Sequence, residues 1–408
     1  MAGTPQLLRA SALVVLLLVG GAGRAPGADS CRTLEVRPGQ SIQAAVSRAQ
    51  PCDWVLVAPG VYRGSVTIRT PGLHLRGLDR NRVVLDGGHA AVNGIVVTAD
   101  DVTIENLTVR NFDRRSPNDE ETGNELFWQG VRGWSARWVS AYDTGLLGGY
   151  GFWAGRSTDG RLAHVYASGF DDSGLYVGSC SDCRTAIVDS VAERNAVGLA
   201  ATNAGGRFTV ERTTFRENAV GVSLNSSDSD PPPPQLGTCG AVPPTTTRLP
   251  RCTILRSNRV LDNNVLTVPA NTSSVHPGWG IGIALLGAQG DLIANNVITG
   301  NTNVGVLGIA LARFALAGNR IAGNRISGSR MAIALAGGPN NCITEPGPLS
   351  CVHTTTSTPP AASVLALVRR LHREFVAHDR RGQPAPPPQP TMPRPCLGVP
   401  ANSLCRTS

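Results

Sequence analysis

Short apolar segments alternate with polar turns along most of the chain, and the alternation repeats with a fixed period. Glycines mark the repeat at intervals of 23 or 24 residues: Gly151, Gly174, Gly198 and Gly221, and again Gly282 and Gly305. Each glycine opens a similar unit, such as GLYVGSCSDCRTAIVDSVAERN, in which no apolar stretch is long enough for a helix. Three short strands in about 23 residues are one coil of a parallel β-solenoid, whose coils stack like neighbouring strands. The pattern therefore predicts an all-β parallel solenoid.

An asparagine recurs in the same units, eight residues after an inward-facing apolar position. The members of this column are Asn195, Asn218, Asn301 and Asn324, and Asn263 also fits it. Stacked asparagines can join the turn of one coil to the turn of the next, because their amides bond backbone groups that a turn otherwise leaves unpaired. We interpret this column as structural.

The first coils resemble a known family. The segments SIQAAVSRA, DWVLVAPGVYRGSVTI and GLHLRGLDRNRVVLDGG are similar to the entry segment of right-handed parallel β-helix proteins of the pectin-lyase-like superfamily. The resemblance extends over residues 34–338 and implies that fold, with coils of about 23 residues. It implies no single activity, because the superfamily contains polysaccharide lyases, hydrolases, esterases and epimerases as well as non-enzymatic surface proteins.

Both ends of the expected β-helix carry a segment that can cover them. Ser41 is placed to cap a short helix near residues 41–49, whose apolar residues share one face. Residues 361–380 put Leu371 and Phe375 on one apolar stripe, which favours a second helix as a lid on the last coil.

The chain divides into three parts along the sequence. These are a secretion signal over residues 1–28, the β-helix domain over residues 29–352, and a C-terminal part over residues 353–408 with the cap helix and a Pro-rich tail. Insertions interrupt the repeat at residues 114–127, 226–251 and 266–278. The first and third fall at the same turn, where we expect them to form the walls of a groove.

Residues 1–28 have the features of a signal peptide. Arg9 precedes an apolar stretch that is too short to span a bilayer, and small residues follow it. We therefore expect a secreted, extracellular protein with no transmembrane segment in the mature chain.

All ten cysteines follow the signal and lie in close pairs along the sequence. An even number of cysteines in an exported chain indicates disulfides, although the sequence alone does not fix their connectivity. We expect neighbours to pair: Cys31 with Cys52, Cys180 with Cys183, Cys239 with Cys252, Cys342 with Cys351, and Cys396 with Cys405.

The formal charge is +8, and all 37 basic residues are arginine. A diffuse positive charge suits acidic polysaccharides, anionic surfaces or nucleic acid, and biased codon usage explains it equally well. The chain has no arginine-rich run or nucleic-acid motif, so we expect no nucleic-acid partner. Only 16% of the residues are charged, which excludes coiled coils and acidic disordered scaffolds.

Three early coils depart from the asparagine column. An aromatic residue takes the place of the asparagine there and an aspartate follows it: Phe112-Asp113, Tyr142-Asp143 and Phe170-Asp171, the last followed by Asp172. If these pairs share one register, Asp143 and Asp171 lie one coil apart, at about 5 Å. Stacked carboxylates repel each other, which raises a pKa or requires a cation.

That arrangement suits three kinds of chemistry. Carboxylates about 5 Å apart match a retaining glycosidase, and about 6.5–9.5 Å suits an inverting one. The oxygens of Asp113, Asp143 and Asp171 suit Ca²⁺, which is the one cofactor we consider. Elimination or epimerisation of uronates needs a base and a group that neutralises the substrate carboxylate. Candidates for these roles are Arg137, Arg161, His164 and Tyr142.

Two observations bear on this hypothesis. The segment SGFDDSG is similar to the acidic floor segment of β-helix uronan epimerases and lyases, but the Pro-His of the epimerase motif is missing, which puts epimerase activity in doubt. Eight of the eleven Trp and Tyr residues lie between positions 128 and 176. Flat rings pack on the C–H faces of sugars, so the excess favours a sugar-stacking platform, with core filling as the alternative.

We expect an extracellular protein that acts on or binds a polysaccharide, and an acidic one in view of the charge. The catalytic candidates are Asp143, Asp171, Asp172, His164 and Arg161. The substrate-binding candidates are Trp128, Arg137, Tyr142, Tyr150 and Trp153. The alternative is a non-catalytic adhesion or glycan-binding β-helix, in which the aspartates cap turns by accepting backbone N–H groups. Copper delivery fits poorly, because Met and His are too scarce for soft ligands.

Overall fold

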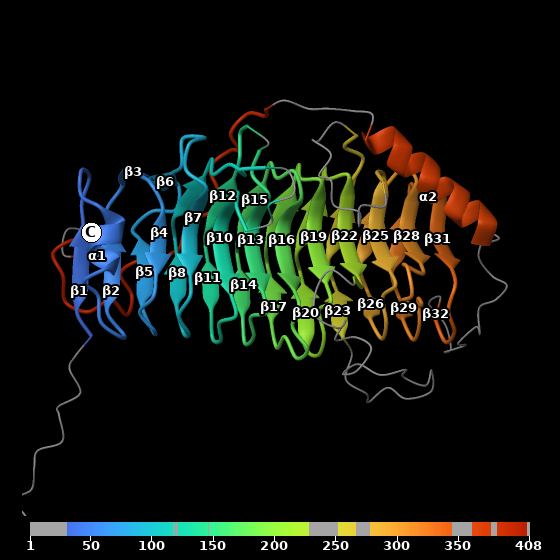
Figure 1. The fold of residues 1–408 in the computed structure, drawn as a ribbon, viewed down its shortest axis with the longest axis horizontal. Helices are drawn as coiled ribbons and strands as arrows, with labels where there is room; N and C mark the ends of the chain where they lie inside the picture. The colour runs from blue at the N-terminus through green and yellow to red at the C-terminus, as the bar shows by residue number, and fades with distance from the viewer. Residues whose placement is uncertain are drawn as a thin grey trace, which may run out of the picture.

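The computed structural model describes residues 31–116, 119, 121–145, 147–227, 252–266, 278–344, 361–376 and 382–405. Within these ranges the chain forms an elongated three-sided solenoid of parallel strands, whose axis runs horizontally in Figure 1. The residues expected to form the signal peptide lie outside the described ranges.

Each coil passes through three parallel sheets, here named A, B and C, in that order. Sheet A contains twelve strands: β1 (Thr33–Val36), β2 (Trp54–Val57), β5 (His74–Gly77), β8 (Thr103–Glu105), β11 (Ser135–Arg137), β14 (Arg161–Ala163), β17 (Ala186–Val188), β20 (Phe208–Glu211), β23 (Thr253–Arg256), β26 (Leu292–Ala294), β29 (Arg320–Ala322) and β32 (Cys342–Thr344). Sheet B contains ten strands: β3 (Gly60–Arg63), β6 (Val83–Asp86), β9 (Thr108–Arg110), β12 (Ser140–Tyr142), β15 (Tyr166–Ser168), β18 (Val191–Glu193), β21 (Thr214–Arg216), β24 (Arg259–Leu261), β27 (Val297–Thr299) and β30 (Arg325–Ser327). Sheet C contains ten strands: β4 (Val66–Ile68), β7 (Asn93–Val97), β10 (Asn124–Gln129), β13 (Tyr150–Gly155), β16 (Ser173–Gly178), β19 (Val197–Thr202), β22 (Val220–Asn225), β25 (Ile281–Leu286), β28 (Val304–Ile309) and β31 (Met331–Ala336).

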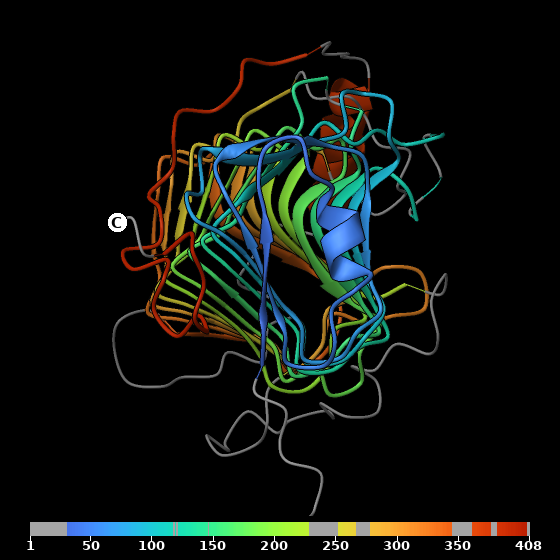
Figure 2. The same cartoon turned by 90° about the vertical axis from the view of Figure 1, so that its left-hand side faces the viewer.

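Side chains that point into the solenoid form one continuous apolar core. In sheet A, Ala136, Leu162 and Ile187 occupy equivalent positions in successive strands and are fully buried. In sheet C, Leu126 and Phe152 do the same. Figure 2, which looks along the axis, shows how the coils superimpose around this core. The predicted all-β parallel β-helix is confirmed.

The recurring glycines lie in the strands of sheet C, where the backbone of the next coil approaches closely. A Cβ at Gly151 would lie 2.6 Å from the carbonyl oxygen of Gly174, and one at Gly198 would lie 2.5 Å from that of Gly221. Real Cβ atoms do not approach an oxygen so closely, so Gly151 and Gly198 could not be replaced by a larger residue without a shift of the backbone.

Rows of buried asparagines join the coils at all three turns rather than at one. Between sheets B and C the row contains Asn195, Asn218, Asn263 and Asn301. Between sheets A and B it contains Asn258, Asn296 and Asn324, and between C and A Asn319 and Asn341 follow Asp291.

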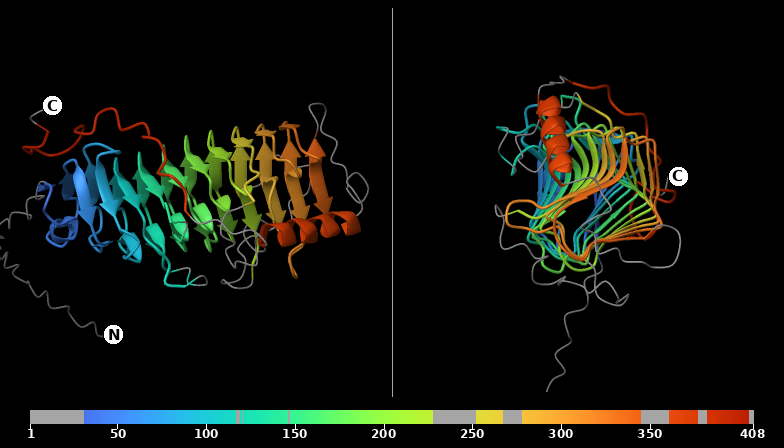
Figure 3. Two further views of the ribbon diagram at one scale, coloured as in Figure 1. Left: turned by 90° about the horizontal axis from the view of Figure 1, so that it is seen from above. Right: turned by 90° about the vertical axis from the view of Figure 1, so that its right-hand side faces the viewer.

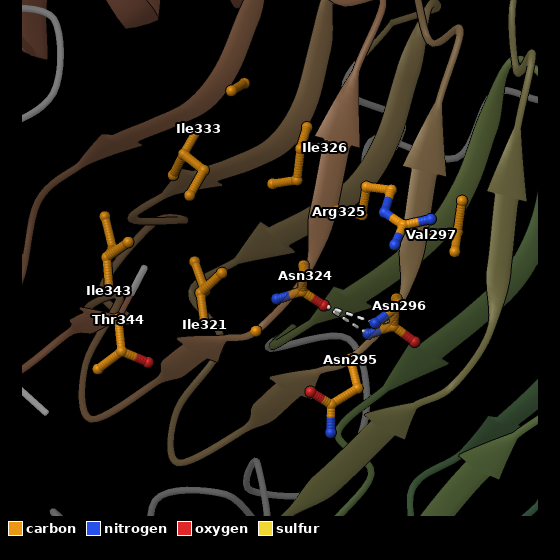
Figure 4. A pocket seen from close by; sticks show the side chains of 12 residues that line it. Asn295, Asn296, Val297, Ile321, Asn324, Arg325, Ile326, Ile333, Ile343 and Thr344 are labelled. Atoms are coloured by element: carbon orange, nitrogen blue, oxygen red, sulfur yellow. Dashed lines mark hydrogen bonds between the residues drawn. The ribbon is translucent and has the colours of Figure 1, made fainter. Parts of the chain in front are cut away.

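Asn324 therefore does not belong to the row of Asn301, and its predicted assignment is wrong. Its side chain accepts two hydrogen bonds from Asn296, at the A–B turn (Figure 4). The cause is chain length: ten residues, 310–319, connect β28 to β29, whereas five, 287–291, connect β25 to β26. Because of the extra residues, Asn324 has the sequence spacing expected for the B–C turn although it lies at the A–B turn.

The two helices lie at opposite ends of the solenoid (Figure 1). Helix α1 (Ile42–Val46) covers the first coil, and the Ser41 hydroxyl accepts the backbone N–H of Ala44 as expected of an N-cap. Helix α2 (Ala361–Val376) lies beside the last coils, on the outer face of sheet C, where Leu371 is fully buried. Helix α2 thus covers the outer face of sheet C at the last coils.

The interior of the last coil borders a cavity of about 530 Å³. Apolar core positions such as Ile321, Ile326 and Ile333 line it together with the end of the A–B asparagine row (Figure 4). It is therefore the end of the core, and none of the candidate site residues lines it.

The C-terminal tail returns along the solenoid towards the first coil (Figure 3). Its contacts follow in order from the middle coils to the first: Gln383 donates to the carbonyl of Asp143, Pro395 accepts from Arg76, and Pro400 accepts from Thr33. The tail is an integral part of the surface of the first five coils.

Three of the expected disulfides are formed, namely Cys31–Cys52, Cys180–Cys183 and Cys396–Cys405. Cys252 is also disulfide-bonded, and its expected partner Cys239 lies outside the described residues, as does Cys351, the expected partner of Cys342. Within the described part of the chain, neither helix has the length and hydrophobicity that a membrane span requires.

Candidate functional site

The B–C turns of successive early coils bring acidic side chains together. Asp113 lies in the turn after β9, Asp143 in the turn after β12, and Asp171 and Asp172 in the turn after β15. We call these four residues the acid row. The aspartates therefore meet at the B–C turns of successive coils, as expected. Asp143 and Asp171 do not occupy equivalent positions, however, because Tyr142 pairs with Ser168 and Asp143 therefore precedes the position of Asp171 by two residues.

Asp143 is fully buried and holds its own turn together. Its Oδ1 accepts the backbone N–H of Gly145 at 2.6 Å, and its Oδ2 accepts that of Gly148. Burial and the neighbouring charge of Asp113 raise the pKa of Asp143 to about 6, against the lowering effect of the two N–H groups and His89. Asp143 therefore caps its turn, which is the role that the alternative interpretation of the sequence gave to the aspartates.

Tyr142 does not share a position with Phe112 and Phe170, and this part of the prediction is wrong. The strand register pairs Tyr142 with Arg110 and Ser168, two residues before the two phenylalanines. The turn that follows it, residues 143–149, is longer than the turn at residues 169–172, which hides the offset in the sequence. Tyr142 lies on the outer face of sheet B, and its hydroxyl accepts a hydrogen bond from Arg110.

Asp171 and Asp172 share one cation but have opposite surroundings. The Nη2 of Arg114 lies 3.6 Å from an oxygen of each. Asp172 accepts hydrogen bonds from the Tyr150 hydroxyl at 2.7 Å and the Ser173 hydroxyl at 2.6 Å. The Oδ1 of Asp171 has no hydrogen-bond partner among the described residues.

The surroundings of Asp171 change its protonation. Burial raises the pKa of Asp171 well above its usual value, and the charges of Asp172, Asp143 and Asp113 raise it further against the opposing effect of Arg114. The row therefore contains an acid whose protonated form is favoured, next to a second carboxyl group that accepts two hydroxyl hydrogen bonds.

Arg114 belongs to the centre of this site. Its side chain is 3% exposed, it passes over the ring of Tyr150 at 5.3 Å, and its backbone N–H donates to Leu147 in the turn of the next coil. From the sequence we expected this position in an insertion that forms a groove wall, and we did not identify it as a site residue. Only the sequence Asp113-Arg114, an arginine next to a predicted site acid, could have indicated it.

Glu125 is a buried acid that sequence analysis also missed. It occupies the glycine column of sheet C, between Asn124 and Leu126, which pair with Tyr150 and Phe152 on either side of Gly151. Its Oε1 accepts the backbone N–H of Phe112, just as Asn195 accepts the backbone N–H of Phe170 at the B–C turn two coils later. Burial raises its pKa well above the usual value, and so do the charges of Asp143 and Asp113.

His89 completes the site from the preceding coil. It lies in the turn between β6 and β7, with Nδ1 3.0 Å from Asp113 Oδ1 and 3.9 Å from Asp143 Oδ1. The imidazole is partly open to solvent, with 37% of its side chain exposed.

Three candidates from the sequence lie away from the acid row. Arg161 opens β14 and Arg137 ends β11, both in sheet A, and Arg137 pairs with Glu105. His164 lies at the A–B turn, stacked on Trp138 at 4.1 Å. Its neighbouring charges are Asp189 and arginines, none of them in the acid row. The structure therefore does not place Arg137, Arg161 and His164 beside the aspartates, where we expected them.

The aromatic residues pack differently from a sugar-stacking platform. Trp128 is fully buried in the core between Trp134 and Phe152, so it is not open to a substrate. Trp153 lies on the outer face of sheet C, but Phe127 covers one side of it at 4.4 Å and Tyr176 lies parallel at 5.5 Å. The rings form a stack along the axis in which one ring covers the next.

The two insertions expected as groove walls are described in part. Strand β10 begins at Asn124, so the last residues of the expected insertion 114–127 belong to sheet C. At the second insertion, Trp279 donates its indole N–H to Glu374 of α2. Residues 267–277 lie outside the described ranges.

No protein-family model and no curated protein matches the chain. Solved structures resemble its fold. The A-modules of the Azotobacter vinelandii mannuronan C-5 epimerases AlgE4 and AlgE6 superimpose with TM-scores of 0.50 and 0.52, at 18% and 17% sequence identity. The matches cover 77% and 78% of this chain and 95% and 94% of those modules. The catalytic domain of a GH87 α-1,3-glucanase variant in complex with tetrasaccharides gives a TM-score of 0.52 at 12% identity, over 81% of this chain and 70% of that chain.

The likeness at these identities concerns the fold alone. The chain shares the right-handed parallel β-helix fold of these proteins, the fold that its first coils led us to expect.

Proposed function

We propose that the chain is an extracellular enzyme that hydrolyses glycosidic bonds of a polysaccharide, with the acid row as its active site. The observation that carries this proposal is the pair Asp171 and Asp172, two adjacent carboxyl groups with opposite surroundings. Pairs of acids whose environments separate their pKa values are the usual arrangement for acid and base roles in glycoside hydrolysis.

The roles follow from the surroundings of each group. Asp171 retains its proton and is the general acid, which protonates the glycosidic oxygen as the bond breaks. Asp172 is oriented by hydrogen bonds from Tyr150 and Ser173, and as the second carboxyl group it activates water or stabilises the developing positive charge on the sugar. Arg114 holds both side chains in place between its guanidinium and the next turn.

The charge of the site favours hydrolysis over elimination. Elimination from a uronate needs cationic groups that neutralise the substrate carboxylate. Here the one arginine of the site already faces two aspartates, and the acid row would repel a polyuronate. The net charge of the whole chain suited an acidic polymer, whereas the site suits a neutral glycan.

The similar structures support this proposal at the level of substrate class. Their names describe proteins that act on polysaccharides, a mannuronan epimerase and an α-1,3-glucanase, but at 12–18% identity they carry no residue roles to this chain. An extracellular location is supported by the disulfides, which persist in oxidising compartments.

A substrate panel tests the proposal. Purified protein is incubated with neutral glucans, mannans and xylans and with polyuronates, while new reducing ends and the ultraviolet absorbance of unsaturated uronates are followed. We expect reducing ends without absorbance on a neutral glycan. Asp171→Asn should lower the rate by about 10²–10⁴-fold, the usual contribution of a general acid. Asp189→Asn, which removes an acid at the A–B turn, is the matched control and should leave the rate unchanged.

Two results would overturn the proposal. Absorbance that rises on a polyuronate would identify a lyase, which the sequence also allowed. Binding of a glycan in affinity electrophoresis without cleavage, and equally in Asp171→Asn and the wild type, would identify a non-catalytic glycan-binding protein.

A further inference from the structure

His89, Asp113 and Asp143 converge at one point from three successive coils. One ligand atom of each, a ring nitrogen or a carboxylate oxygen, lies within 4.8 Å of the other two. Because each residue lies in a B–C turn whose backbone is bonded to the next coil, the fold itself sets this spacing. Asn111, for example, accepts the backbone N–H of His89 and donates its own to Tyr142.

The hydrogen bonds around His89 allow a tautomer in which Nδ1 can bind a metal ion. The Thr144 hydroxyl donates to Asn111 Oδ1 at 3.1 Å, so it can accept a hydrogen bond from His89 Nε2, which lies at 3.2 Å. In that tautomer the lone pair of Nδ1 faces the carboxylate of Asp113 at 3.0 Å. A cation between the two groups would remove the repulsion between their lone pairs.

The hydrogen bond from His89 Nε2 to Thr144 is also typical of a metal-binding histidine. Such residues donate their other ring N–H to an acceptor, which orients the ring toward the metal. Thr144 provides this acceptor, and Asn111 in turn holds Thr144 through both its backbone N–H and its hydroxyl.

A second, independent observation is a buried acid next to the cluster. Glu125 is fully buried, and its Oε2 has no hydrogen-bond partner among the described residues. Its Oε1 accepts the backbone N–H of Phe112, the residue before Asp113, and the charges that act on it most strongly are those of Asp143 and Asp113. A third carboxyl group thus lies near the two aspartates, where a bound cation would offset the repulsion among all three.

We propose that His89 Nδ1, Asp113 and Asp143 bind one divalent first-row transition metal ion, of which Zn²⁺ and Mn²⁺ are the representatives. Asp143 contributes a carboxylate oxygen to this cluster from a fully buried side chain. His89 and Asp113 are the solvent-facing ligands, with 37% and 14% of their side chains exposed. Water completes the coordination on that side, which makes the site exchangeable rather than a closed structural centre.

This site differs from the calcium site that the sequence suggested on Asp113, Asp143 and Asp171. Ca²⁺ binds oxygen ligands, whereas an imidazole nitrogen suits transition metals. Asp171 is unsuitable as a ligand because its Oδ1 lies 3.6 Å from the guanidinium of Arg114. The inference does not depend on the proposed hydrolase activity, and metal binding is measured without a glycan.

Metal binding to chelator-treated protein tests the proposal. Zn²⁺, Mn²⁺ and Ca²⁺ are titrated separately by calorimetry, and bound metal is counted by elemental analysis after gel filtration. We expect one Zn²⁺ per chain, tighter than Ca²⁺, and a rise in the unfolding temperature with Zn²⁺. His89→Ala and Asp113→Asn should each weaken Zn²⁺ binding by at least tenfold and abolish the rise in unfolding temperature.

His164→Ala is the matched control. This histidine is also partly exposed and lies at the turn between sheets A and B, so its loss should leave Zn²⁺ affinity unchanged. No binding at millimolar Zn²⁺, binding that persists in both His89→Ala and Asp113→Asn, or tighter binding of Ca²⁺ would each overturn the proposal.

Discussion

The same turn of the β-helix is built in two different ways along the chain. In the late coils, between sheets B and C, each buried asparagine bonds the next, as Asn218 does with Asn195 on one side and Asn263 on the other. In the early coils the same turn holds the acid row, in which Asp143 and Asp171 have raised pKa values. One turn is saturated with hydrogen bonds, and the other is not.

The two versions of the turn contribute differently to the stability of the fold. An asparagine row satisfies buried backbone groups without charge, so it stabilises the fold at any pH. Buried carboxyl groups within reach of one another destabilise the fold, since each must be desolvated and repels its neighbours. A turn that departs from a stable local solution in this way is the expected location of a functional site.

The largest effect on stability should come from the late coils. Asn218→Ala removes an acceptor for the backbone N–H of Asn195 and a donor to Ala192, all within the core. Each buried group left unpaired costs about 1–3 kcal/mol, so we expect a loss on the order of 3 kcal/mol or more in the free energy of unfolding. Denaturant unfolding measures it.

Thr302→Ala provides the control at the same turn, because this side chain is exposed. Its free energy of unfolding should match that of the wild type. Equal losses in Thr302→Ala and Asn218→Ala would contradict the structural role of the asparagine row.

The next effect concerns the pH dependence of stability in the early coils. Because burial raises the pKa of Asp171 in the folded chain, the folded state binds this proton more tightly than the unfolded state does. The free energy of unfolding therefore decreases as the pH rises from about 4 to the folded-state pKa, by about 1.4 kcal/mol for each pH unit of that interval. Asp171→Asn should remove this contribution, so it should become increasingly stabilising relative to the wild type as the pH rises.

Unfolding of both proteins at pH 4 and at pH 8 measures this difference. A stability difference that stays constant with pH would mean that Asp171 titrates as an ordinary aspartate.

A smaller effect should follow from the support of Asp172. Tyr150→Phe removes the hydroxyl that donates to this carboxylate at 2.7 Å but preserves the packing of the ring. Hydrogen bonds to charged groups contribute about 1.5–3 kcal/mol, so we expect a rate of glycan cleavage at least tenfold lower. Tyr62→Phe, which removes a hydroxyl bonded to a backbone carbonyl in the first coil, should leave the rate unchanged.

The smallest effect should come from the exposed ion pairs between coils. Arg212 pairs with Asp189 across one coil, with 54% of the arginine side chain exposed. Solvent screens such pairs, so Arg212→Ala should not change the denaturation midpoint measurably. A clear loss would show that the arginines contribute to the stability of the solenoid.

The fold could be predicted from the sequence because its signals are local and repeated. The glycine column and the asparagine row recur at the spacing of the coil, and both follow from close contacts between neighbouring coils. The location of the aspartates at one turn could be predicted for the same reason. Their alignment could not, because the longer turn after Tyr142 offsets Asp143 from Asp171. Asn324 shows the limit of spacing, since a longer connection before it moved it to another turn.

The rest of the site depends on features that spacing does not contain. His89 precedes the clear repeats, Arg114 looks like part of a solvated loop, and Glu125 occupies a position that other coils give to glycine. Whether an aromatic residue points inward also depends on local geometry, which is why Trp128 was wrongly assigned to the surface. These residues act through contacts between coils, and only the three-dimensional register reveals them.

The central claim is that the early B–C turn serves function and the late one serves stability. Measuring the free energy of unfolding and the rate of glycan cleavage in both Asp171→Asn and Asn218→Ala tests it most directly. We predict that Asp171→Asn is at least as stable as the wild type at neutral pH and loses cleavage, while Asn218→Ala loses stability and its folded fraction cleaves at the wild-type rate. Cleavage at the wild-type rate by Asp171→Asn, together with a loss of stability, would contradict the account.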